Sequence, residues 1–101
     1  MNAREIYRLV VNQYGESYQV DKAIEEMGEL IQALIKYRQH GTNKDNVAEE
    51  MADVEIILSE LKLIFSNRES VKEWKKYKLE RLESNVKKDR LNEEKFQTEF
   101  F

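Results

Sequence analysis

The chain has 101 residues and a formal net charge of −3; charged residues make up 37% of it, and it contains no proline and no cysteine. This length suits one domain with a modest core, and this composition favours a mostly helical protein with solvated faces. The absence of cysteine excludes disulfides and thiolate metal sites, and the slight negative charge argues against general binding to a nucleic acid polymer or an anionic membrane. The N-terminal segment has an early glutamate and no long apolar run, so we expect neither a signal peptide nor a membrane span and, by default, a cytoplasmic protein.

Hydrophobic periodicity predicts an all-α fold with four helices and gives no strand pattern. In chain order, the helices are expected over about residues 2–14, 19–40, 44–65 and 70–90. Gly41 stands where a left-handed residue commonly ends a helix, and Thr42 or Asn43 is the expected N-cap of the third helix. Ser66 with Glu69 and Ser70 with Glu73 both fit a capping box, so the fourth helix is expected to begin near residue 70.

Two acidic pairs lie on either side of the turn between the second and third helices. Glu26 and Glu29 belong to the second helix, and Glu50 and Asp53 belong to the third. A spacing of three residues places both members of a pair on one helix surface, so two antiparallel helices would bring the four carboxylates together. Four converging carboxylates with no obvious fixed cationic partner indicate a site for a hard cation, because Mg²⁺ prefers oxygen ligands in near-octahedral geometry.

The direction of Glu50 favours this interpretation. At about 100° per residue, Glu50 points into the apolar arc of the third helix, and Asp53 lies just outside the edge of that arc. An ionised carboxylate aimed into a core is unfavourable unless it is paired or bound to a metal. Glu49, Glu55 and Glu60 lie outside the arc, and we expect them to be ordinary solvated charges. The alternatives left open are a wet acidic face for the first pair and a salt bridge for Glu50.

Two cations of the fourth helix lie close to its apolar side. Lys78 points into the arc that contains Trp74 and Leu82, and Arg81 lies beside Trp74. A lysine stem can run along apolar surface with its ammonium group at the edge, so Lys78 is explained either by this packing or by an ion pair with Glu50. The functional alternative is that Lys78 and Arg81 bind phosphate oxygens near the metal, Arg81 as a planar fork and Lys78 as a point charge.

The runs KAIEEMGELIQAL and VAEEMADVEIIL together resemble the MazG-type, all-α nucleoside triphosphate pyrophosphohydrolases. The family pattern of Glu-x-x-Glu, a spacer and Glu-x-x-Asp carries over residue by residue onto Glu26, Glu29, Glu50 and Asp53. The apolar residues that follow each motif also match. The later segment WKKYKLERL resembles the fourth helix of the family, where a Lys and an Arg often face the phosphates. The resemblance covers about residues 19–83.

This resemblance implies a four-helix bundle-like core that assembles as a homodimer or homotetramer. It also implies a Mg²⁺-dependent enzyme, with Mn²⁺ as a substitute, that hydrolyses a nucleoside triphosphate between the α and β phosphates to a nucleoside monophosphate and pyrophosphate. Glu26 and Glu29 are the catalytic candidates, because one carboxylate of this pair would orient the attacking water as general base. Lys78 and Arg81 would stabilise the leaving pyrophosphate.

The base and ribose are expected against aromatic and amide groups of the first helix and the loop after it, where the candidates are Gln13, Tyr14, Tyr18 and Gln19. Residues 1–101 are interpreted as one domain, with the core at about 19–83 and a charged C-terminal tail at about 89–101. In that tail, Phe96 and Phe100 are spaced to pack on one helix face. The preferred base and sugar stay open.

Three other functions compete with this interpretation. A phosphoribosyl-ATP pyrophosphohydrolase has the same fold type and similar acidic motifs, so only substrate assays separate the two. A di-iron carboxylate bundle needs Glu-x-x-His motifs on two helices, whereas the single His40 stands beside the turn at Gly41. A non-enzymatic helical interaction module accounts for the amphipathic helices and the aromatic tail, but not for a glutamate in the apolar arc of the third helix.

Overall fold

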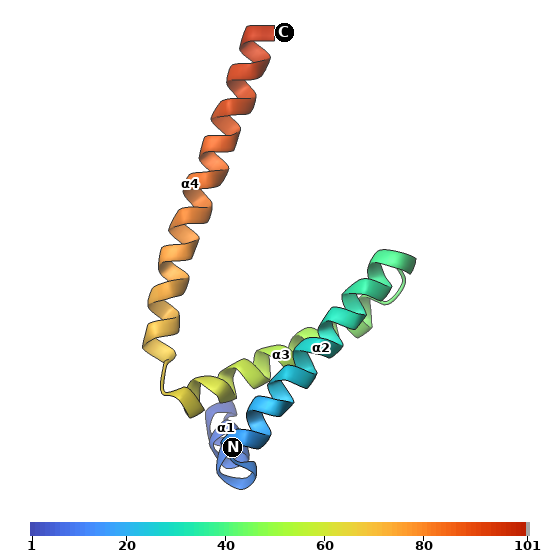
Figure 1. Ribbon diagram of the computed structural model, residues 1–101, viewed down its shortest axis with the longest axis vertical. Coiled ribbons are helices and arrows are strands. Elements are labelled where there is room, and N and C mark those ends of the chain that lie inside the picture. The colour runs from blue at the N-terminus through green and yellow to red at the C-terminus, as the bar shows by residue number, and fades with distance from the viewer. Residues whose placement is uncertain (101) are drawn as a thin grey trace. The chain divides into compact units, whose positions relative to one another are not determined.

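The structure, a computed structural model, describes residues 1–100, except for the side chains at positions 96 and 98–100. This part of the chain contains four helices and no strand, so the all-α prediction is confirmed (Figure 1). The helices are α1 (Ala3–Tyr14), α2 (Glu16–His40), α3 (Lys44–Phe65) and α4 (Arg68–Phe100). None of these helices combines the length and the apolar character that crossing a membrane requires. The chain divides into two compact units, Met1–Asn67 and a second that begins at Arg68.

Local hydrogen bonds explain where several helices begin and end. The Asn2 side chain accepts a hydrogen bond from the backbone N–H of Glu5 at 2.9 Å, which caps the start of α1. Gly41 has a φ of 68°, and its N–H donates to the carbonyl of Tyr37 at 2.7 Å, so the predicted end of α2 is confirmed. Asn43 occupies the N-cap position of α3 but makes no capping bond there. Its Nδ2 instead donates to the carbonyl of Ala33 on α2 at 3.0 Å, which ties the two helices together beside the turn.

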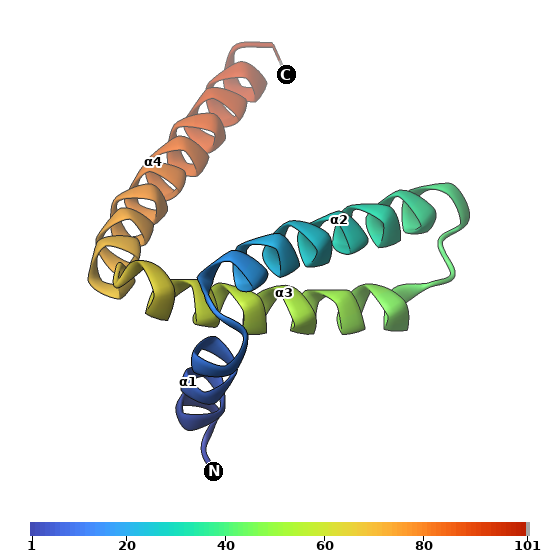
Figure 2. The ribbon, with the colours of Figure 1, turned by 60° about the horizontal axis from the view of Figure 1, so that its bottom comes forward.

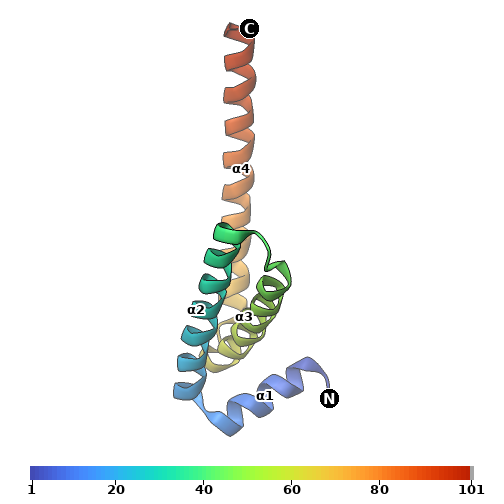
Figure 3. The ribbon, with the colours of Figure 1, turned by 90° about the vertical axis from the view of Figure 1, so that its right-hand side faces the viewer.

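The first unit is built on a hairpin of α2 and α3, which run antiparallel and side by side (Figures 1 and 2). The connection between them is only residues 41–43, and short helix–helix connections make antiparallel neighbours. α1 crosses the open end of this hairpin and packs mainly against α3 (Figure 3). α1 therefore covers the part of α3 that lies at the open end of the hairpin.

The helix bounds differ from the prediction mainly at α2 and α4. α3 has the predicted bounds, and α1 begins one residue later than expected. α2 begins at Glu16 rather than near residue 19, because Gly15, with a φ of 87°, confines the break to a single residue. α4 begins at Arg68 and continues to Phe100, well past the predicted end near residue 90. The side chains of Phe96 and Phe100 lie outside the described part, so their predicted packing is not decided.

The interface of the hairpin lies to one side of the expected apolar stripes. The most buried side chains of α2 are Gln19, Ala23 and Ala33, and those of α3 are Ile57 and Glu60. Two of these five are polar, and neither polar residue was expected in the core. The small alanines allow the two helices to approach closely, so the acidic edge of each stripe is drawn into the interface.

The other edge of each stripe is left exposed. The exposed apolar side chains on this edge include Ile24, Met27, Ile31 and Leu34 on α2 and Met51, Leu58 and Phe65 on α3. Successive residues are turned by about 100° around the helix axis, so the centre of this exposed group lies roughly 100–130° from the centre of the buried residues of the same helix. Viewed from the N-terminus of each helix, this rotation has the same direction in α2 and in α3. Because the helices run antiparallel, the two exposed arcs lie on the same side of the hairpin. The hairpin therefore has one apolar face that nothing within Met1–Asn67 covers.

Candidate metal centre and adjoining pocket

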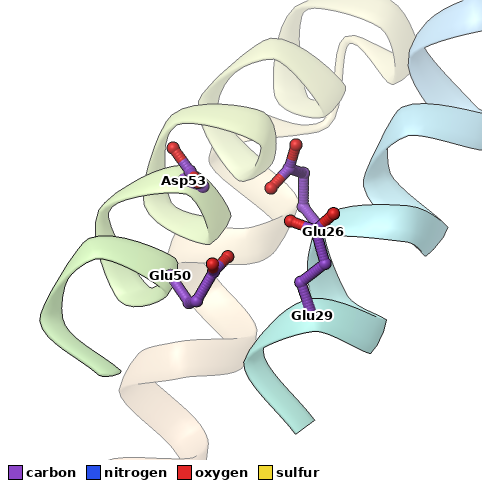
Figure 4. A group of neighbouring side chains, drawn as sticks. All are labelled: Glu26, Glu29, Glu50 and Asp53. Carbon is purple, nitrogen blue, oxygen red and sulfur yellow. The ribbon is translucent and has the colours of Figure 1, made fainter. Parts of the chain in front are cut away.

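The structure brings together the four carboxylates that the sequence singles out. Glu26 and Glu29 project from α2 toward Glu50 and Asp53 on α3 (Figure 4). One oxygen atom from each of the four side chains lies within 4.8 Å of the others. The three-residue spacing in each helix and the antiparallel packing of the two helices are what produce this convergence. We call these four residues the carboxylate cluster.

Burial makes this convergence energetically demanding. All four residues of the carboxylate cluster are partly buried. The Oε2 atoms of Glu26 and Glu50 are buried and have no hydrogen-bond partner among the described residues. A buried acceptor without a partner loses its hydration without compensation, and the loss is larger for a charged group. A bound cation would supply the partner that these two oxygens lack.

One cation does lie beside the cluster, which corrects the expectation that no fixed cationic partner exists. Nζ of Lys22 lies 3.5 Å from Oε1 of Glu26 and 3.5 Å from Oε1 of Glu25. Glu25 is exposed, so Lys22 joins a solvated carboxylate to the edge of the cluster. The signal was present in the sequence, because Lys22 precedes Glu26 by four residues on one helix face.

The pKa of Glu26 shows that Lys22 does not balance the charge. Burial raises the pKa of the Glu26 carboxyl above its ordinary value, and the nearby carboxylates of Asp53 and Glu29 raise it further. Lys22 acts in the opposite direction, but the net shift is upward. Negative charge at Glu26 is thus disfavoured in the metal-free protein, and a divalent cation among the four oxygens would reverse that balance.

The donor set has the chemistry and the size of a Mg²⁺ site. Mg²⁺ binds oxygen atoms at about 2.0–2.1 Å, so two ligands on opposite sides of the ion are about 4.2 Å apart. The four carboxylate oxygens, all within 4.8 Å of one another, need to move only slightly to reach this geometry. Mg²⁺ usually keeps some coordination positions for water or for substrate phosphates, and partial exposure of the cluster leaves room for them. Within Met1–Asn67, no basic side chain forms an ion pair with Glu50, so the salt-bridge alternative has no partner there.

A pocket of about 240 Å³ adjoins the carboxylate cluster. All three helices of the first unit line it, through Val10, Tyr14, Tyr18, Gln19, Lys22, Glu26, Asp53, Ile56, Ile57 and Glu60. The pocket therefore shares Glu26 and Asp53 with the cluster. The rings of Tyr14 and Tyr18 stack with their centroids 5.0 Å apart, and each side chain is about half exposed.

Three of the four side chains expected around the base line this pocket. They are Tyr14, Tyr18 and Gln19, which the end of α1 and the first turn of α2 place together. Gln13 is exposed and is not among the lining residues. That these side chains contact the base and ribose of a nucleotide stays a prediction.

Glu60 is the largest error in the sequence analysis. It was expected to be solvated, but only 5% of it is exposed, and it lines the pocket. The expectation was wrong because α1 packs on the side of α3 that carries Glu60, and the residue pattern of α3 alone does not show this cover. Burial raises the pKa of the Glu60 carboxyl above its ordinary value. Glu60 follows Asp53 by seven residues and therefore shares its direction, which was the available signal. Glu49 and Glu55 are exposed, as predicted.

Lys78 and Arg81 lie on α4, in the second unit. Lys78 lines a shallow apolar groove on that helix with Trp74 and Leu82, which agrees with a lysine stem lying along apolar surface. The guanidinium of Arg81 lies over the ring of Tyr77, 6.0 Å from its centroid. The binding of phosphate by Lys78 and Arg81 stays a prediction.

Comparison of the chain with models of protein families, with curated proteins and with solved structures gave no match. The carboxylate cluster, the adjoining pocket and the chemistry of their residues are therefore the features that indicate a function.

Proposed function

We propose that the protein is a Mg²⁺-dependent nucleoside triphosphate pyrophosphohydrolase that forms a nucleoside monophosphate and pyrophosphate. The observation that carries this proposal is the convergence of four carboxylate oxygens within 4.8 Å, two of the side chains having a buried oxygen with no protein partner. Such a donor set suits Mg²⁺, or Mn²⁺ as a substitute, and Mg²⁺ in proteins is commonly paired with substrate phosphates. A pocket with an aromatic wall beside the metal ligands suits the remainder of a nucleotide.

The chain's own residues supply the other requirements of hydrolysis. When bound, Mg²⁺ would act as a Lewis acid and offset the negative charge that develops on the phosphate oxygens. Glu26 or Glu29 accepts a proton from water as the water oxygen attacks the α-phosphorus. The bond between the α-phosphorus and the bridging oxygen breaks, and pyrophosphate leaves with the bonding electron pair. Lys22, at the junction of the cluster and the pocket, is a further cation available to the phosphates.

The proposed assembly is a homodimer or homotetramer. Its support is the apolar face of the hairpin, where side chains such as Ile31, Leu34 and Leu58 are 57%, 48% and 40% exposed. Contiguous apolar faces of this kind commonly mark interaction surfaces, and homo-oligomers with closed symmetry are the usual outcome. The MazG-type arrangement of the helices is likewise part of this proposal, whereas the described fold is four helices.

The experiment is pyrophosphate release from a panel of ribo-, deoxyribo- and modified nucleoside triphosphates and phosphoribosyl-ATP, with Mg²⁺ and in EDTA. We expect release only with the metal, with one monophosphate formed per pyrophosphate. Asp53→Asn should lower kcat at least about 100-fold. Glu55→Gln is the matched control, because Glu55 is on the same helix and exposed, and it should keep wild-type activity. The proposal fails if no member of the panel is cleaved, or if Asp53→Asn and Glu55→Gln lose equal activity.

A further inference from the structure

Two buried polar side chains line the pocket without a protein partner. Gln19 is 1% exposed, and its Oε1 has no hydrogen-bond partner among the described residues. Glu60 is 5% exposed, and within the described part of the chain it takes part in no hydrogen bond or ion pair. Buried polar groups in folded proteins are nearly always hydrogen-bonded, so the Gln19 oxygen needs an explanation. The Glu60 carboxyl beside it keeps some access to the pocket and has only solvent or a ligand to bind.

The surroundings do not supply the missing partners. Of the other residues in the pocket wall, Val10, Ile56 and Ile57 are apolar, and none of the polar ones forms a hydrogen bond or an ion pair with Gln19 or Glu60 in the described part of the chain. A network built for stability would satisfy both groups internally, because a partly satisfied polar network is less stable than an apolar core. An external molecule with its own donors and acceptors would satisfy them instead.

The size of the pocket limits what that molecule is. Sites for drug-sized ligands occupy about 300–1,000 Å³. At about 240 Å³, this pocket admits one planar ring system rather than a whole nucleotide. The stacked rings of Tyr14 and Tyr18 form part of its wall and are half exposed, so they offer a flat aromatic surface. Bases in nucleic-acid complexes commonly stack on aromatic side chains, and this stacking contributes to their affinity.

We propose that this pocket binds the nucleobase of the substrate, with Glu60 and Gln19 hydrogen-bonding the edge of the base and with the triphosphate extending to Glu26 and Asp53. The identity of the ligand as a nucleotide rests on the proposed function. Glu60 is then a specificity-determining residue that was absent from the sequence-based site.

The hydrogen-bonding chemistry of the two side chains matches a base edge. Each base presents neighbouring donors and acceptors, as N–H groups, carbonyl oxygens and ring nitrogens. The Gln19 amide offers both a donor and an acceptor. The Glu60 carboxyl offers two acceptor oxygens when ionised and an O–H donor beside a carbonyl acceptor when protonated. A glutamine at position 60 would keep both a donor and an acceptor, whereas a methionine would fill similar space and keep neither.

The test is calorimetric binding with Mg²⁺ present, using two kinds of probe. The first is the set of α,β-methylene triphosphates of the four common nucleosides, which cannot be cleaved between the α and β phosphates. The second is inorganic tripolyphosphate, which has no base. We expect the best nucleotide analogue to bind the wild-type chain at least about 10-fold more tightly than tripolyphosphate. Glu60→Met should weaken that analogue about 10-fold or more, and Glu60→Gln should stay within about threefold of wild type.

Tripolyphosphate is the internal control, since neither variant of Glu60 should change its affinity. Gln19→Met provides a second, independent variant and should behave as Glu60→Met does. The inference is overturned if the wild-type chain binds all analogues no more tightly than tripolyphosphate, or if Glu60→Met weakens both kinds of probe equally. Failure of the proposed function has a different signature: the binding pattern is obtained, but the wild-type chain releases no pyrophosphate from cleavable triphosphates.

Discussion

Replacing Glu50 by glutamine should stabilise the metal-free protein. Glu50 is partly buried, and its Oε2 has no hydrogen-bond partner in the described chain. Two unit charges at 4.8 Å, the span of the cluster, repel by about 1 kcal/mol in water and by about 3.5 kcal/mol at an effective dielectric constant of 20. Partial burial places the cluster between these limits. Glu50→Gln keeps the shape of the side chain and removes one charge, so the free energy of unfolding should rise by about 1–3 kcal/mol.

The assay is a thermal melt of wild type and Glu50→Gln in EDTA and with Mg²⁺. For a domain of 60–100 residues, about 1 kcal/mol corresponds to a shift in Tm of about 4–8 °C, so Glu50→Gln should melt at least about 4 °C above wild type in EDTA. Mg²⁺ at about 100 times its Kd would stabilise wild type by about 2.7 kcal/mol, because it binds the native state only. Glu50→Gln has lost one of four ligands and should gain less.

Glu49→Gln is the control for this measurement. Glu49 is the preceding residue on α3 and is exposed, so its replacement should change the free energy of unfolding by less than about 0.5 kcal/mol in either condition. If Glu50→Gln melts below wild type in EDTA at both about pH 5 and about pH 8, Glu50 is part of a structural ion pair, and the metal site on α3 is refuted. An increase in stability together with loss of activity would instead show that the cluster is strained for function.

Three further predictions concern the phosphate contacts, the buried acid and the assembly. Lys78→Ala and Arg81→Ala should each lower kcat about 100-fold without weakening Mg²⁺ binding, whereas unchanged kcat with a lower Tm would mean that Lys78 only packs along the groove. Folding raises the pKa of the Glu60 carboxyl. The stabilising contribution of this group is therefore fully present below about pH 4 and is lost as the pH rises through the raised pKa. Urea unfolding should therefore find Glu60→Gln more stable than wild type at about pH 8 and equal to it near about pH 4; a constant difference would contradict this. Sedimentation should show a dimer or tetramer for wild type and a smaller species for Leu58→Asp, and a wild-type monomer would remove the assembly claim.

The sequence was sufficient to predict the helices and the acidic cluster because both depend on local spacing. Gly41 and the apolar periodicity determine the hairpin, and the three-residue spacing within each acidic pair determines the convergence. The rotation of each helix about its axis could not be obtained in this way. Ala23 and Ala33 allow close packing on one edge of the α2 stripe, while Ile31 on the other edge is left exposed, and the choice between the edges depends on the partner helix.

For the same reason, the lining of the pocket could be predicted from the sequence only in part. Tyr14 and Gln19 were identified from their residue types and from their position near a loop. Glu60 was not, since its burial is caused by α1, a helix that is distant in sequence from α3. A glutamate on a helix is usually solvated, and only the cover from another element shows that this one is not.

The short turn at residues 41–43 has a consequence for how the protein tolerates insertions and deletions. All four metal-ligand candidates come from one hairpin, so the register of α2 against α3 determines the geometry of the site. The three-residue connection and the bond from Asn43 to the Ala33 carbonyl restrict that register. An exposed turn about 18 Å from Glu29 along the helix is ordinarily a permissive place to lengthen a chain. Here, added residues would let α2 slide along α3 and separate the carboxylates while the helices themselves persist. The length of this surface turn therefore helps to set the geometry of a site with which the turn makes no contact.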